Sequence, residues 1–165
     1  MANPDPPLDP AQLADPTNSI GYLTRIAFRS FSRAMERRTL PFGVSAGQWR
    51  FLRHLWMEDG VTQRQLSHKV GTREATTVTA INSLVRSGWV ERAPSRTDRR
   101  KIHIRLTGRA KTLQADLLPI VAEVNALATR GIAVRDLATF RRVLTQINAN
   151  LAEEAADPLV QGEDV

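Results

Sequence analysis

The chain has 165 residues, a formal net charge of +6 and no cysteine, and 42% of its residues are hydrophobic. This composition predicts one folded domain, alone or with a dimerisation arm, and excludes a largely disordered chain. No apolar run approaches the ~18 residues that a membrane span needs. The amino-terminal stretch also lacks the features of a signal peptide, so we expect a cytoplasmic protein. The absence of cysteine fits a reducing compartment and excludes a cysteine nucleophile.

The positive charge is concentrated in one segment. Residues 86–111 contain nine basic and two acidic side chains, a net +7 against +6 for the whole chain. A concentrated basic patch favours a polyanionic partner. The alternative is an ordinary solvated surface.

Two helices are predicted in the amino-terminal third. Residues 1–17 hold five of the nine prolines and are expected to form a flexible or extended arm. Apolar residues recur at helical spacing over 18–39, and Pro41 with Gly43 ends that helix. Ser45 is expected to cap a second helix, which Asp59 and the following glycine stop.

A helix-turn-helix follows. Thr62 and Gln65 have the spacing of a capping box for a short helix over 62–69, and Gly71 supplies the turn. Thr72 is expected to cap a second helix over 73–87, which Gly88 ends. The inward stripe of this second helix is predicted to be Thr77, Ala80, Ile81 and Leu84.

The outward face of the second helix is expected to enter a DNA major groove. Short hydroxyl groups, an amide and a valine methyl suit contacts with base edges, and the arginines suit phosphates or guanine. The alternative is a solvated helix face, but four threonines are poor helix formers. The residues predicted to contact DNA are Arg73, Thr76, Val78, Thr79, Asn82 and Arg86.

A β-hairpin with a basic loop is predicted next. Residues 89–92 and 101–106 have the pattern of strands, and the second alternates between charged and apolar side chains. In the loop, Asp98 is expected to orient Arg100 for insertion into a minor groove. Arg96, Arg99 and Lys101 would contact phosphates, unless the loop is merely a solvated basic turn.

Two long helices complete the chain. Thr107 is expected to start a helix that Pro119 bends and Gly131 ends, and a last helix covers 133–152. The outer helices have more apolar surface than one small domain covers, which favours a homodimer over a monomer with a helical cap. The expected organisation is an arm (1–17), a dimerisation helix (18–44), a DNA-binding lobe (45–106), dimerisation helices (107–152) and an acidic tail (153–165).

The segments VTQRQLSHKVG, NSLVRSGWVER, TDRRKIHIRLT and LTGRA resemble the multiple-antibiotic-resistance regulator (MarR) family of winged-helix transcription factors over residues 18–152. The resemblance implies a mainly α fold with a small β-hairpin, a winged helix-turn-helix with N- and C-terminal dimerisation helices. It also implies a homodimer on a pseudo-palindromic double-stranded DNA operator and a small-molecule effector that loosens DNA binding. Thr77 departs from the family, which usually has a larger apolar residue there.

An effector pocket is expected between the dimer helices and the DNA-binding lobe. An aromatic wall with a cation or an imidazole suits an aromatic acid or its derivative. The alternative is that the tryptophans belong to the core and the arginine is solvated. The candidates are Phe31, Trp49, Arg53, His54 and Trp56.

The sequence predicts a ligand-responsive DNA-binding regulator, most simply a repressor. The alternative is a winged-helix module for non-specific DNA or protein binding without ligand control. The three histidines are scattered, and the sequence has no Gly-rich phosphate loop or nucleophile elbow. We therefore expect no metal, no cofactor and no catalytic residues.

Overall fold

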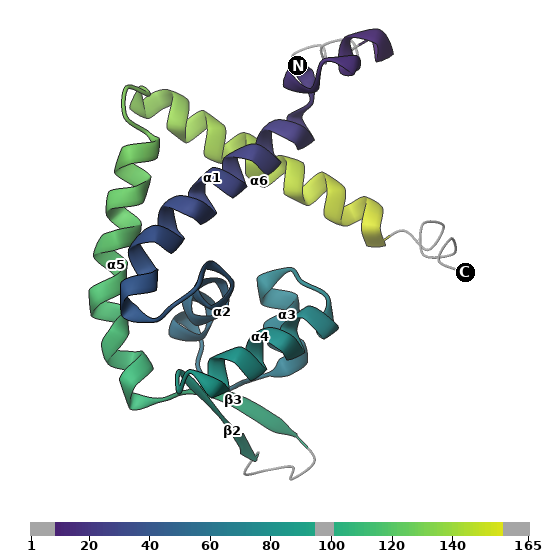
Figure 1. The fold of residues 1–165 in the computed structure, drawn as a ribbon. Coiled ribbons are helices and arrows are strands. Elements are labelled where there is room, and N and C mark those ends of the chain that lie inside the picture. The colour runs from purple at the N-terminus through teal and green to yellow at the C-terminus, as the bar shows by residue number, and fades with distance from the viewer. Residues whose placement is uncertain (1–8, 95–100, 157–165) are drawn as a thin grey trace. The chain divides into compact units, whose positions relative to one another are not determined.

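The computed structural model describes residues 9–94 and 101–156, with side chains as far as residue 152 (Figure 1). The elements are two 3-10 helices η1 (Pro10–Ala14) and η2 (Pro16–Asn18), α1 (Ile20–Thr39), η3 (Leu40–Phe42), α2 (Ala46–Met57), β1 (Val61–Thr62), α3 (Gln63–Val70), α4 (Glu74–Arg86), β2 (Val90–Pro94), β3 (Ile102–Leu106), α5 (Gly108–Ala128) and α6 (Val134–Ala156). The predicted class, mainly helical with a small hairpin, is confirmed.

The chain divides into two compact units, residues 1–124 and residues 125–165. The first contains the three-helix lobe, the sheet, α1 and most of α5. The second contains the end of α5, a turn in which Gly131 has φ +79°, and α6. No described side chain of α6 is buried, and its apolar residues Phe140 and Leu151 are 55% and 58% exposed.

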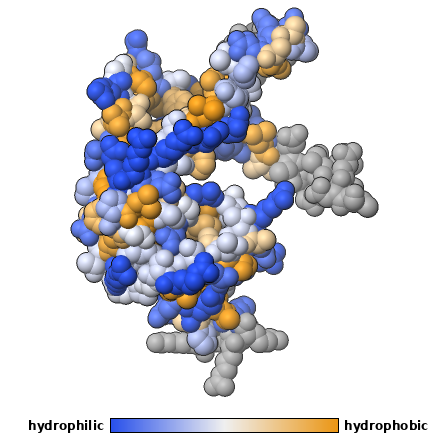
Figure 2. Space-filling model, viewed as in Figure 1, coloured by the Kyte–Doolittle hydropathy of each residue, from blue (hydrophilic) through white to orange (hydrophobic). Residues whose placement is uncertain are grey.

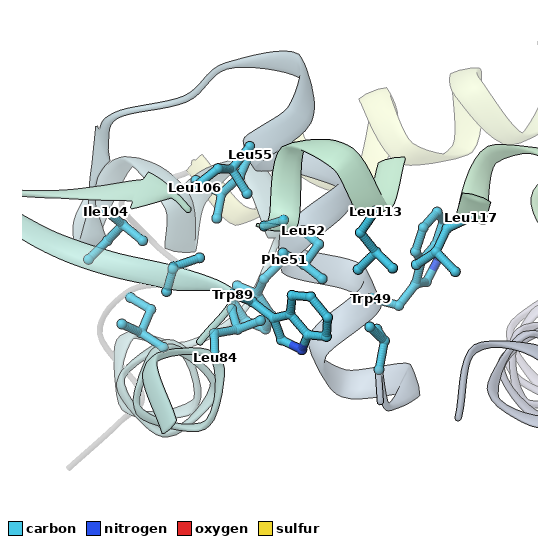
Figure 3. Packing of buried hydrophobic residues seen from close by; sticks show 14 of the residues in the cluster. Trp49, Phe51, Leu52, Leu55, Leu84, Trp89, Ile104, Leu106, Leu113 and Leu117 are labelled. Carbon is cyan, nitrogen blue, oxygen red and sulfur yellow. The ribbon is translucent and has the colours of Figure 1, made fainter. Parts of the chain in front are cut away.

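The core of the first unit joins α2, α3, α4, the sheet and α5 (Figure 3). Leu52, Leu66 and Leu84 have no exposed surface, and Trp89 is 2% exposed. Each fully buried side chain of this size contributes roughly 1.5–3 kcal/mol through the hydrophobic effect. Leu117 extends the same core into α5. The helices of the lobe are therefore fixed against one another and against the sheet.

The sheet has three antiparallel strands in the order β1-β3-β2. Val90 pairs with Leu106, and Val61 pairs with Ile104 on the other side of β3. The two-residue strand β1 was not predicted. The predicted alternation in β3 holds for Ile104 and Leu106, which are buried, whereas Ile102 is 52% exposed at the wing end of the strand.

Local capping explains most helix boundaries. The Ser19 hydroxyl accepts from the Tyr22 amide at the start of α1, and the Thr107 hydroxyl accepts from the Ala110 amide in the first turn of α5. Pro119 lies inside α5 as predicted. The described part of the expected arm forms η1 and η2, because Asp9 and the residue before Pro16 accept backbone hydrogen bonds that close each turn.

One predicted cap is wrong. Helix α4 begins at Glu74 with Arg73 in the N-cap position, so Thr72 lies one residue outside it. The Thr72 hydroxyl pairs instead with the Thr77 hydroxyl, with 3.0 Å between the two oxygens. The threonine therefore stabilises the turn between α3 and α4 rather than the free amides of α4.

Candidate DNA interface

The outer face of α4 is set by the residues that it buries. Thr77, Ile81 and Leu84 have no exposed surface, as predicted, and each residue turns a helix by about 100°. This rotation places Thr79 and Asn82 opposite the core. The residues on or beside α4 that were predicted to contact DNA are all exposed, as are Glu74 and Ala75; the predicted residues are Arg73, Thr76, Val78, Thr79, Asn82 and Arg86. All six predicted helix residues thus share the accessible side of α4.

The turn before α4 is tied by hydroxyl groups. Gly71 has φ +66°, a left-handed conformation that favours glycine. The Ser67 hydroxyl donates to the Thr72 carbonyl at 2.6 Å, and the Thr77 hydroxyl is 3.2 Å from the Arg73 carbonyl. Thr77 therefore occupies a core position with its hydroxyl satisfied, which explains how a polar residue is accommodated there.

Asn82 contacts the strand that leads into the wing. The Arg92 guanidinium on β2 donates to the Asn82 side-chain oxygen over 2.6 Å, and both residues are exposed. The base of the wing therefore lies against the outer face of α4. Arg92 lies in the basic segment, but its partner could not be predicted, because strand alternation does not show which helix residue a strand side chain meets.

The tip of the wing falls outside the described residues. Arg96, Asp98, Arg99 and Arg100 lie there, and their predicted roles stay predictions. Lys101, the first described residue after the wing tip, is exposed and lines a 540 Å³ hollow together with side chains of α3. These α3 residues are Arg64, Gln65, His68 and Lys69.

A second hollow, of 420 Å³, lies between the start of α2 and α4. Thr76 and Thr79 line it from α4, and Ser45, Gly47 and Arg50 line it from α2. Figure 2 shows a surface over α4 and the adjacent hairpin that is mainly hydrophilic or intermediate, with isolated hydrophobic spots. The sequence did not predict that side chains at the start of α2 line a hollow beside α4, because the residues of α2 were interpreted only as a cap and a buried apolar stripe.

Gln48, which also lines this hollow, connects α2 to α4. It is 7% exposed, and its side-chain nitrogen lies 2.8 Å from the Ser87 hydroxyl and 3.1 Å from the Ser83 hydroxyl. Its side-chain oxygen accepts from the Ser45 amide, which completes a capping box at the start of α2. One buried amide thus starts α2 and holds the second half of α4.

Comparisons with known proteins agree with this geometry. The model of the MarR family matches residues 42–101. The solved transcriptional regulator PA3341 is 34% identical over 82% of this chain and 99% of its own, with a TM-score of 0.73. A MarR transcriptional regulator from Methanosarcina mazei Go1 is 28% identical over 81% of this chain and 96% of its own, with a TM-score of 0.75.

The chain belongs to the MarR family of transcriptional regulators. A putative MarR family transcriptional regulator from Listeria monocytogenes, solved in complex with a 26mer DNA, shares the fold with a TM-score of 0.76. It is 16% identical over 82% of this chain and 91% of its own.

The residues predicted to line an effector pocket in this MarR-family chain are divided between core and surface. Trp49 is 7% exposed and meets Trp56 edge-on, with 5.6 Å between ring centroids. The Trp56 ring nitrogen donates to the Ala110 carbonyl at 2.9 Å. Phe31 is 38% exposed on α1, and Arg53 is exposed on α2. Both tryptophans therefore contribute to the packing of the core.

His54, on α2, is half-buried. Burial, followed by the charges of Arg53, Lys69 and Arg50, lowers the pKa of His54. Within residues 9–94 and 101–156, the structure contains no cluster of His, Cys, Asp or Glu that could hold a metal ion, and no helix there is long and apolar enough to cross a membrane.

Proposed function

We propose that this chain is a ligand-responsive transcriptional repressor that binds a pseudo-palindromic operator as a homodimer. The observation that carries the proposal is the juxtaposition of the exposed polar face of α4 with Arg92 at the base of the basic wing. A helix and a hairpin that share one face suit simultaneous contact with a major groove and the neighbouring minor groove.

Within this proposal, the α4 residues have different roles. Thr76, Thr79 and Asn82 are hydrogen-bonding groups for base edges, and Val78 is a contact for a thymine methyl group. Arg86, in the last turn of α4, is a phosphate contact, and Arg73 before α4 contacts a phosphate or a guanine. The exposure of all these side chains supports the assignment.

The wing roles come from the sequence. Arg100 would enter the minor groove with its guanidinium oriented by Asp98, and Arg96, Arg99 and Lys101 would contact phosphates. Lys101 is exposed and shares its hollow with Arg64 and Lys69 of α3, and with Glu58, which lies 2.6 Å from Lys69. Lys101 and Arg64 therefore support phosphate contacts along this edge of the lobe. Arg100→Ala should therefore weaken operator binding at fixed salt.

The outer helices are proposed to form the dimer interface. On α1, Ile20, Leu23 and Phe28 are 58%, 46% and 55% exposed, a large apolar surface for a monomer. On α6, Val134 and Phe140 are 83% and 55% exposed. A two-fold dimer would cover such faces and would place two α4 helices about 34 Å apart along the duplex.

The effector is proposed to be an aromatic acid or its derivative, bound near Phe31, Trp49, Arg53, His54 and Trp56. The cation of Arg53 and the imidazole of His54 suit a carboxylate beside an aromatic wall. A thermal-shift screen with aromatic carboxylates, and cyclohexanecarboxylate as the non-aromatic control, tests this part. A ligand at 100 times its Kd should add about 2.7 kcal/mol to the free energy of unfolding.

DNA binding is tested by comparing a selected operator with random duplex at several salt concentrations. The logarithm of affinity should fall with the logarithm of salt by about 0.9 for each phosphate neutralised. An operator-to-random affinity ratio near one would contradict sequence reading and favour a non-specific winged-helix module. A ratio of ~1,000 or more is expected for a specific regulator.

A further inference from the structure

We infer that Arg92 is a positioning residue that fixes the Asn82 amide, so that Asn82 presents only its hydrogen-bond donors to DNA and selects guanine over adenine. The inference rests on the proposed function and names the base that one residue of the α4 face reads. It follows from the 2.6 Å contact between the Arg92 guanidinium and the Asn82 side-chain oxygen.

The chemistry of the pair fixes the orientation of the amide. An arginine guanidinium has five N–H donors and no acceptor, so the amide must turn its oxygen toward Arg92. The amide nitrogen, with its two hydrogens, is then directed away from the guanidinium. A hydrogen bond to a charged donor is about twice as strong as one between neutral groups, which favours this orientation before DNA arrives.

Both partners are attached to rigid elements. Arg92 lies within β2 and pairs with Ile104 of the central strand β3. Asn82 lies beside Ile81 on α4, and Ile81 has no exposed surface. Because the backbone cannot move freely at either residue, the side-chain contact sets which atoms of Asn82 face outward.

A side chain that presents only donors discriminates between the two purines. Guanine presents two acceptors in the major groove, N7 and O6, whereas adenine presents the acceptor N7 and the donor N6. Asparagine recognises adenine by using its oxygen and its nitrogen together. Here Arg92 occupies the Asn82 oxygen and places a cation beside it, so the adenine N6 amino group would face another donor.

The test is a selection of binding sites from a randomised duplex library with the full chain and four variants. The variants are Arg92→Met, Asn82→Ala, the double variant and Arg105→Met. Arg105 is the matched control because it is an exposed arginine on the adjacent strand whose side chain lies beside Gly60 rather than α4. Urea denaturation of each variant verifies the fold.

The wild-type chain should select guanine at one position of each half-site, and replacing it with adenine should weaken binding by roughly tenfold or more. Arg92→Met should reduce that preference to less than about threefold, because the freed amide can turn its oxygen to adenine. Asn82→Ala should relax the same position, and the double variant should match the single variants. Arg105→Met should leave every base preference unchanged.

Two kinds of failure are distinguishable. If the wild-type chain selects no sequence at all, the proposed function fails. If it selects an operator but Arg92→Met keeps the same guanine-to-adenine ratio, this inference is wrong and the proposed function stands. A uniform loss of affinity for all sequences in Arg92→Met would identify a phosphate contact and would also overturn the inference.

Discussion

Replacing Gln48 with methionine tests whether the helix that is proposed to read DNA is held in place by a single buried amide. Methionine keeps the length of the side chain but removes its hydrogen bonds. The chain contains its own control, because Gln65 occupies the same capping-box position at the start of α3 and is exposed. Gln65→Met removes a capping box alone, whereas Gln48→Met also removes the connection to α4.

The expected magnitudes follow from the hydrogen bonds that each variant loses. Gln65→Met should lower the free energy of unfolding by about 0.5–1 kcal/mol, the usual cost of a weakened cap. Gln48→Met loses its cap and two bonds to hydroxyl groups, of 2.8 Å to Ser87 and 3.1 Å to Ser83. At about 0.5–1.5 kcal/mol for each bond and about 0.5–1 kcal/mol for the cap, the total loss should be roughly 1.5–4 kcal/mol. The serines are half-buried and regain water, so no larger penalty is expected.

The assay is urea denaturation followed by circular dichroism, with operator affinity measured for the same preparations. Equal slopes of the unfolding free energy against urea would show that the compactness of the two states is unchanged. Gln48→Met should be less stable than Gln65→Met by at least about 1 kcal/mol. Equal losses for the two variants would refute a connection between α2 and α4 through Gln48.

Three further predictions concern the turn, pH and the start of α5. Gly71→Ala should lower the free energy of unfolding by about 1 kcal/mol in urea denaturation, because φ at Gly71 is +66°. Gly108→Ala is the control and should be neutral or stabilising, because Gly108 has an ordinary φ and no atom lies within 4 Å of the added carbon. Burial lowers the pKa of His54, so the unfolded chain binds a proton at this histidine more readily than the folded chain does. The free energy of unfolding should therefore fall as pH drops below about 6.5, and it should fall less steeply in the His54→Gln variant than in the wild-type chain. Arg109→Met should cost about 0.5–1 kcal/mol, since its guanidinium lies 4.0 Å from the Trp89 ring centroid; no change in the urea midpoint would show that this stacking is not stabilising.

Helix boundaries and the inward stripe of α4 are predictable from sequence because their causes are local. A capping box requires two residues three apart, and Thr62 with Gln65 forms one in the structure. Likewise, the burial of Ile81 and Leu84 follows from helical spacing. The Thr72 cap failed for a related reason. A threonine hydroxyl before a helix can reach more than one hydrogen-bond partner, and in the folded turn that of Thr72 pairs with the Thr77 hydroxyl over 3.0 Å.

Side-chain and strand contacts between different elements were beyond sequence reasoning. The strand β1 contains two residues and forms only because Val61 and Thr62 meet β3. Similarly, the contact of Arg92 with Asn82 joins residues whose elements are brought together by the core, not by spacing. The candidate interface was therefore predictable as a set of exposed helix residues, but not in the orientation of its functional groups.

The stability of the lobe and its proposed DNA contacts depend on the same core, yet experiment can separate them. A domain of ordinary stability has at least about 5 kcal/mol in reserve, so a loss of 2 kcal/mol still leaves more than about 99% of the molecules folded. Unfolding alone then changes operator affinity by a negligible amount. If Gln48→Met weakens operator binding severalfold while Gln65→Met does not, the cause is displacement of α4 within folded molecules. Such a result would show that Gln48, which is not among the proposed DNA contacts, determines where Thr79 and Asn82 meet the bases.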